Sequence, residues 1–153
     1  MSVIKRLAEL GISLPKPMNP VGSYVPVTIT GSLVVVSGQL PAIDGKVAVT
    51  GKLGGGVSIE EGQHAARLCL INVLAQLQAA LPGGLDSITR VNRLGGFIAA
   101  TPDFTQHAVV MNGASDLAVA AFGDLGRHAR ATVGVASLPL DAAVEVEGMF
   151  WLG

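Results

Sequence analysis

Two helix-forming segments separate the strand-like segments of this chain, and this alternation restricts the possible folds more than any other feature. The first helix is expected after Ser58, because Ser58 and Glu61 have the spacing of an N-terminal capping box and an apolar stripe follows through Leu77. The second helix is expected to start at Thr101 and to end before Gly123. Strand patterns, rich in β-branched and other apolar residues, cover residues 25–30, 33–37, 87–100, 131–136 and 143–151.

The order of these segments is hairpin, helix, strand, helix, hairpin, which predicts an α+β fold. Both helices must then pack on one face of a single mixed sheet. No long helix remains to cover the other face, so we expect identical subunits to cover it in a closed oligomer. The low content of charged residues, 14% of the chain, is consistent with apolar surface buried between subunits.

The 153 residues suffice for one domain of ordinary size. Residues 1–18 are expected to form a short helix, capped by Ser2, and a proline-rich lead-in, while residues 19–153 form the domain itself. Lys5 and Arg6 interrupt the apolar start, so we expect no signal peptide and a cytoplasmic location.

Composition and charge argue against several classes of protein. Hydrophobic residues make up 50% of the chain, but no apolar run approaches the ~18 residues of a spanning helix, so no membrane association is expected. The net charge of -1 and the lack of a Lys/Arg cluster argue against nucleic acid as a partner. Cys69 is the only cysteine, which excludes an intrachain disulfide and a cysteine-rich metal site and favours a buried structural thiol.

Arg130 is the strongest candidate for a residue that reads a ligand. It lies where the chain enters an apolar strand, and its fork of N–H donors matches a carboxylate bidentately. Two interpretations are open: a carboxylate clamp, or a structural ion pair with Glu145 or Glu147 on the neighbouring strand. Glu145 and Glu147 alternate with valines and therefore share one face, where they are either solvated or able to bind and polarise a water beside Arg130.

Several short motifs occur in an order that is typical of one protein family. They are Gly22-Ser23-Tyr24, Ser37-Gly38-Gln39-Leu40-Pro41, Asn72, Asn112, Ala129-Arg130, and Leu138-Pro139 followed by Val144-Glu145-Val146-Glu147. Through these motifs the chain resembles the RidA/YjgF superfamily of reactive imine and enamine deaminases, historically called endoribonuclease L-PSP. The stretch from Asn112 to Leu117 resembles a longer branch of that superfamily, with chains of about 150 residues.

The resemblance implies a chorismate-mutase-like fold and a homotrimer with three pockets at the subunit interfaces. The arginine matching Arg130 would hold the substrate carboxylate, and the glutamate matching Glu145 would position the water that attacks the imine carbon. Ammonia and a 2-keto acid would leave, and no metal or organic cofactor is implied. The residues expected to line the cavity are Tyr24, Gly38, Asn112, His128 and Thr132, of which His128 and Thr132 stand where proline and cysteine are common in the family.

Two other functions remain open at this stage. A trimer that keeps Arg130 as a clamp for a small carboxylate-bearing metabolite but performs no reaction would have the same sequence features. An endoribonuclease or translation inhibitor rests on the historical label alone, and the near-neutral charge weakens it.

Overall fold

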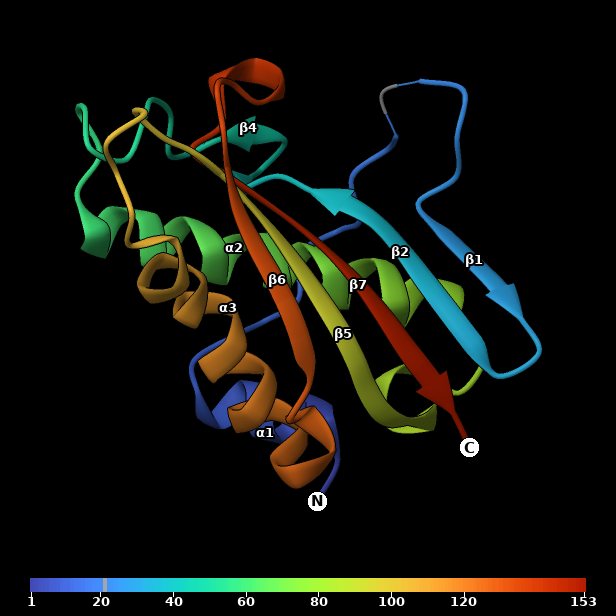
Figure 1. The fold of residues 1–153 in the computed structure, drawn as a ribbon. Coiled ribbons are helices and arrows are strands. Elements are labelled where there is room, and N and C mark those ends of the chain that lie inside the picture. Colours follow the sequence, from blue (N-terminus) through green and yellow to red (C-terminus); the bar gives the residue numbers. More distant parts are fainter. Residues whose placement is uncertain (21) are drawn as a thin grey trace.

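The computed structural model describes residues 1–20 and 22–153, and it confirms the expected α+β fold with two long helices on one face of a mixed sheet (Figure 1). In chain order the helices and strands are α1 (Val3–Glu9), β1 (Val27–Thr30), β2 (Leu33–Gln39), β3 (Ala42–Ile43), β4 (Lys46–Val47), α2 (Ile59–Ala80), β5 (Ile88–Ala99), α3 (His107–Phe122), β6 (Ala129–Val135) and β7 (Val144–Leu152). Short 3-10 helices occupy Gly84–Ser87, Gly123–Gly126 and Pro139–Asp141.

The five-stranded sheet has the order β1-β2-β7-β5-β6, and β3 and β4 form a separate hairpin. β5 and β6 are parallel, whereas the other neighbours in the sheet are antiparallel. The prediction of a closing hairpin between the last two strands is therefore wrong, because β7 inserts between β2 and β5. The central position covers β7 on both edges and buries its inward residues Val144, Val146 and Phe150 completely.

The two long helices begin for different local reasons. At the start of α2 the capping box is confirmed: the Glu61 amide donates to Ser58 Oγ at 3.1 Å, and the Ser58 amide donates to Glu61 Oε1 at 3.2 Å. The predicted start of the second helix at Thr101 is wrong, because α3 begins at His107. Thr101 donates its amide to Leu53 O and its hydroxyl to Asp103, which holds this segment in a turn instead of a helix.

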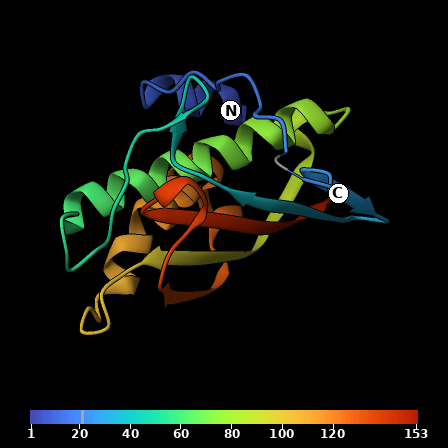
Figure 2. The same ribbon diagram turned by 90° about the horizontal axis from the view of Figure 1, so that it is seen from above.

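The hydrophobic core lies between the sheet and the helices. Its largest fully buried side chains are Phe150, Leu7, Leu53, Leu70, Leu74, Leu77, Leu85, Leu94, Ile98, Met111, Leu117 and Val34. Figure 2 shows α1 and α2 stacked on the same side of the sheet. Because α1 buries Val3 and Leu7 in this cluster, the N-terminal helix shares the core of the rest of the chain.

The segment His107–Gly126 is long and apolar enough, by composition, to be compared with a membrane span. In the structure, however, the α-helical part ends at Phe122 and has 16 residues, which gives a length of about 24 Å. Seven of its residues are buried in the core, including Met111 and Leu117. Packing against α2 and the sheet accounts for the apolar character of α3.

The opposite face of the sheet is bare in the described part of the chain, as the sequence predicts. The register places Phe97 between Glu145 and Val133, and Val35 beside Met149, on this face. Val133 is 50% exposed and Trp151 is 46% exposed. We call this surface the bare face below.

The contact between α2 and α3 depends on Gly113. A Cβ at this position would overlap the backbone carbonyl of Gln63. Gly113→Ala should therefore lower the free energy of unfolding by up to about 2 kcal/mol, because the overlap is with backbone, overpacking costs up to ~3 kcal/mol, and alanine regains only ~1 kcal/mol in a helix. Chemical denaturation measures the change. Gly56→Ala, where a Cβ meets nothing within 4 Å, is the control, and equal stability of the two variants would contradict this account.

Candidate functional site

Arg130 lies on β6, the edge strand, with its side chain against α3. The register pairs it with Leu94 of β5, which is fully buried on the helix-covered face. The guanidinium donates from Nη1 to Asn112 Oδ1 at 2.8 Å and to Ser115 Oγ at 3.0 Å, and from Nη2 to Ala108 O at 3.1 Å. The three acceptors follow an i, i+4, i+7 spacing, so one stripe of α3 holds the guanidinium.

These three bonds leave two N–H groups of the Arg130 guanidinium unpaired in the described part of the chain. A guanidinium has five N–H groups, and the three bonds to α3 leave Nε–H and one Nη2–H without a partner among residues 1–20 and 22–153. Two donors are what a carboxylate accepts in a bidentate contact. Arg130 is thus fixed in direction and still able to bind an anion.

The ion pair between Arg130 and the β7 glutamates, one of the two interpretations that the sequence leaves open, does not form among the described residues. β5 lies between β6 and β7, so Arg130 and Glu145 are not on adjacent strands. The side chains also leave the sheet on opposite faces, because Glu145 pairs with Phe97 while Arg130 pairs with Leu94, the two being three residues apart on β5.

Thr132 is the next residue of β6 on the same face as Arg130. Its register partner is Gly96, where a Cβ would overlap Met111 Sδ of α3. The Thr132 hydroxyl is buried and makes no hydrogen bond to the described residues. Leaving a buried hydroxyl unpaired costs about 1–3 kcal/mol.

Glu145 belongs to a second group of predicted site residues. It lies on the bare face directly over Gly38 of β2, where any Cβ would overlap the carboxylate. Gly38 and Tyr24 line the same small cavity of about 50 Å³, together with Gln39 and Gln76. Tyr24 is 49% exposed at its mouth.

The environment of Glu145 raises its pKa. Burial among apolar neighbours is the larger cause, and the negative charge of Glu147 on the same face is the second. Burial also raises the pKa of Cys69, whose thiol donates to Val144 O at 3.4 Å, in agreement with the predicted structural role.

The structure thus divides the seven predicted site residues into two clusters. The Arg130 cluster, with Asn112, His128 and Thr132, lies between the edge strand β6 and α3. The Glu145 cluster lies where β7 and β2 meet the bare face; Gly38 contacts Glu145 directly, and Tyr24 belongs to it only through the cavity that it lines together with Gly38. Ser115, which the sequence analysis did not single out, joins the Arg130 cluster; its i+3 spacing from Asn112 was the available signal.

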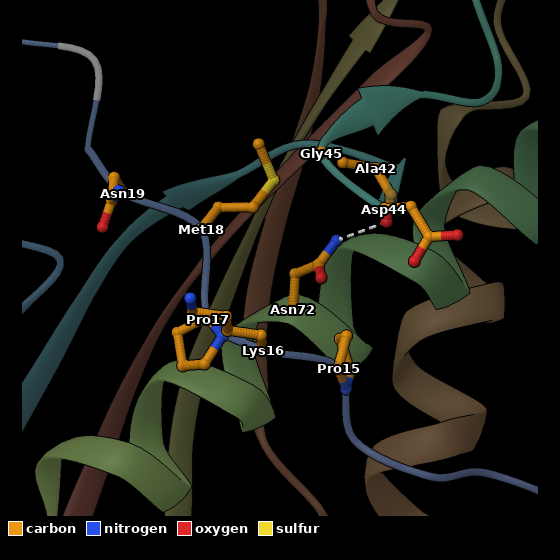
Figure 3. A pocket seen from close by; sticks show the side chains of 9 residues that line it. All are labelled: Pro15, Lys16, Pro17, Met18, Asn19, Ala42, Asp44, Gly45 and Asn72. Carbon is orange, nitrogen blue, oxygen red and sulfur yellow. Dashed lines mark hydrogen bonds between the residues drawn. The ribbon is translucent and has the colours of Figure 1, made fainter.

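A further cavity shares Met18 and Asn19 with the small cavity beside Tyr24 and is lined by no residue of the Arg130 cluster. It has a volume of about 420 Å³ and lies between the proline-rich segment 15–19 and the β3–β4 turn, with Asn72 at its base (Figure 3). Asn72 uses both amide hydrogens on the backbone oxygens of Leu40 and Ala42. The charged residues at the rim, Lys16 and Asp44, are exposed, so this cavity lacks a buried charge that would fix a ligand.

No group of three or more His, Cys, Asp or Glu side chains that could hold a metal ion occurs among the described residues. The chemistry available in the two clusters is that of a guanidinium, a perturbed carboxyl, a hydroxyl and amides. Such groups bind small anions and transfer protons.

Comparison with known proteins identifies the class to which this fold and these clusters belong. The family described as "YjgF/chorismate mutase-like, putative endoribonuclease" matches residues 4–150. The chain therefore belongs to the YjgF family, as the motifs predict, and the match includes α1.

Three relatives illustrate the range of the family. Protein TCP17 of Trypanosoma cruzi is 47% identical over 148 residues, 96% of this chain and 92% of that protein. The crystal structure of a putative endoribonuclease from Shewanella oneidensis has a TM-score of 0.96 at 34% identity and covers 99% of this chain and 100% of that one. E. coli TdcF with bound serine has a TM-score of 0.64 at 25% identity and covers 93% and 97% of the two chains.

Glu147→Gln should lower the pKa of Glu145, because it removes the second cause of the shift, but burial should keep that pKa above its ordinary value. Carboxyl-carbon NMR titration measures it. Glu60→Gln, at an exposed position on α2, is the control. An unchanged Glu145 titration in Glu147→Gln would contradict the coupling.

The same shift determines how stability depends on pH. The folded protein holds the Glu145 proton more tightly than the unfolded chain does, so stability falls as the pH rises from the ordinary glutamate pKa of 4.5 through the raised one. Glu145→Gln should remove this decline in thermal melts across that pH range. A decline that persists unchanged would place its origin at another group.

Proposed function

We propose that this protein hydrolyses small carboxylate-bearing imines or enamines to 2-keto acids and ammonia, in a pocket formed between two subunits. The observation that carries the proposal is the division of the site into complementary halves. The Arg130 cluster offers free donors at an open sheet edge, whereas the Glu145 cluster offers a perturbed carboxyl on an uncovered face. β5 keeps the halves apart within one protomer, so only a second copy can bring them together.

The oligomer we propose is a homotrimer, in which the bare faces of three subunits pack inward. Half-buried apolar residues on this face, among them Phe97 and Met149, favour burial over exposure to water. A closed ring also sets the edge strand of one subunit against the face of the next, because each contact in a cyclic oligomer joins two different surfaces.

In the proposed reaction Arg130 holds the substrate carboxylate through its two free donors. Glu145 takes a proton from a water molecule, and the water oxygen bonds to the imine carbon. The same carboxyl then returns the proton to the nitrogen, which gives a carbinolamine. Glu145 next moves the hydroxyl proton of this intermediate to its amino group, the carbon–nitrogen bond breaks, and ammonia leaves a 2-keto acid. A raised pKa suits this role, since the group must both accept and donate a proton near neutral pH.

Among the relatives, the TdcF structure contains serine, an amino acid with a carboxylate next to an amino-bearing carbon. A ligand of that kind matches the chemistry proposed for the present chain, where a carboxylate meets Arg130. The endoribonuclease label of the family is less well supported by this chain, because its net charge is -1 and its basic residues are dispersed.

The protein should accelerate the release of keto acid from an imine that an amino-acid oxidase generates in the same solution. Semicarbazide traps the imine that escapes hydrolysis, so wild-type protein should lower semicarbazone formation. Glu145→Gln should lose rate by ~10²-fold or more while it still binds pyruvate, since it removes an acid–base group but keeps the shape.

Arg130→Lys should weaken pyruvate binding, measured by calorimetry, nearly as much as Arg130→Ala does, because an ammonium cannot form two parallel N–H contacts.

Three results would contradict the proposed deaminase function or the proposed role of Arg130. Pyruvate binding without any effect on semicarbazone formation, over several imines, would make the protein a metabolite-binding trimer. Full affinity in Arg130→Lys would show that the arginine has a structural role only. Salt-dependent retention and cleavage of RNA by wild-type protein, lost in neither variant, would favour a nuclease.

Subunit mixing tests the location of the site directly. Arg130→Ala and Glu145→Gln chains, each inactive alone, should regain activity when co-expressed, because some interfaces then combine an intact Arg130 with an intact Glu145. Random assembly of equal amounts predicts activity of about a quarter of the wild-type value. Light scattering after size exclusion checks that the mixture is trimeric. A mixture as inactive as its components would place both residues in one protomer's site or in none.

A further inference from the structure

Ser115 connects Arg130 to His128 through an unbroken chain of hydrogen bonds. Arg130 Nη1 donates to Ser115 Oγ at 3.0 Å, and Ser115 Oγ lies 2.9 Å from His128 Nε2. On the other side of the imidazole, Nδ1 lies 2.6 Å from the backbone oxygen of Gly126. All of these residues belong to β6, to α3 or to the turn between them.

When His128 is neutral, the direction of every hydrogen bond in this series follows from its two ends. A carbonyl oxygen can only accept, so His128 Nδ1 must carry the hydrogen that it shares with Gly126. Neutral His128 then has a bare Nε2, to which the Ser115 hydroxyl donates. Guanidinium nitrogens can only donate, so the same hydroxyl oxygen accepts from Arg130.

We propose that His128 and Ser115 are positioning residues that fix the orientation of the Arg130 guanidinium for carboxylate binding. This inference rests on the proposed role of Arg130 and corrects the expected role of His128. Both ring nitrogens of His128 are occupied within the chain, which leaves no hydrogen-bonding atom of the imidazole for a substrate. The Nδ1–H tautomer of His128 leaves Nε2 as an acceptor for the Ser115 hydroxyl hydrogen. The hydroxyl oxygen is thereby oriented to accept from Arg130 Nη1.

The position of Arg130 on the edge strand explains why its guanidinium needs side chains to fix its orientation. β6 is the sheet edge, so Arg130 has a neighbouring strand on one side only. With Nη1 held by Asn112 and Ser115 together, the guanidinium cannot rotate without breaking a charge-assisted bond. The two free donors of Arg130 then keep one direction before a ligand arrives, which lowers the entropic cost of binding.

Substitutions at His128 and Ser115 remove the individual hydrogen bonds between Gly126, His128, Ser115 and Arg130 one at a time. Gln at position 128 keeps an acceptor near the place of Nε2, whereas Asn keeps a donor near the place of Nδ1 and loses the acceptor for Ser115. We therefore expect His128→Gln to retain most of the affinity for pyruvate, and His128→Asn and Ser115→Ala each to weaken it about tenfold. Calorimetry on the full-length protein measures the dissociation constants. His64→Asn and Ser13→Ala, both at exposed positions, are the matched controls.

The double variant Ser115→Ala with His128→Asn distinguishes positioning from a general loss of structure. Both residues act through one Arg130 bond, so the double variant should bind pyruvate about as weakly as either single variant. Independent effects that multiply to about a hundredfold would overturn the proposal. So would equal affinities of His128→Gln and His128→Asn.

An NMR measurement decides the matter even if wild-type protein does not bind pyruvate, which would refute the proposed function alone. At alkaline pH, nitrogen-15 shifts of the ring should show the Nδ1–H tautomer of His128. At neutral pH and low temperature, the Arg130 Nη1 hydrogens, which Asn112 and Ser115 accept, should exchange faster with solvent in Ser115→Ala than in Ser13→Ala. An Nε2–H tautomer, or unchanged exchange of the Nη1 hydrogens, refutes the inference whatever the result with pyruvate.

Discussion

The position of β5 between β6 and β7 is the constraint on which the rest of the site depends. Its inward residues Leu94, Gly96 and Ile98 are buried against the helices, and both of its edges are paired. Because β5 fills the space between Arg130 and Glu145, one protomer cannot bring the guanidinium and the carboxyl together. The core packing of the sheet and the separation of the two clusters within one protomer are consequences of the same strand order.

Close packing of α3 gives the Arg130 cluster its geometry. Gly113 allows α3 to approach α2, and Gly96 allows the sheet to approach Met111. A helix held at this distance presents a carbonyl, an amide oxygen and a hydroxyl to the guanidinium along one stripe. Glycines outside the cluster therefore decide where the unpaired donors of Arg130 point.

Sequence patterns predicted the helices and strands better than the pairing of the strands. The capping box at Ser58 and the two-residue alternation around Glu145 are local signals, and both were confirmed. Strand order depends on long-range burial, so the position of β7 between β2 and β5 was not accessible from periodicity. The late start of α3 depends on the bond between Thr101 and Leu53, which are 48 positions apart in the chain and share no local pattern. Likewise, the contacts of the His128 ring with Ser115 and Gly126 depend on how the turn after α3 folds, and no sequence pattern predicts them.

The central place of β7 also affects how the chain folds during synthesis. β2 and β5 lie on either side of β7, yet β7 leaves the ribosome after both of them. Until then no strand lies between the inward residues Val34 and Leu94, so the β1–β2 half and the β5–β6 half of the sheet cannot pair with each other. Contacts between such distant parts of a chain form slowly and expose apolar surface in the interval. Nascent chains that stall before residue 144 should consequently be clients of chaperones that bind exposed β-strands.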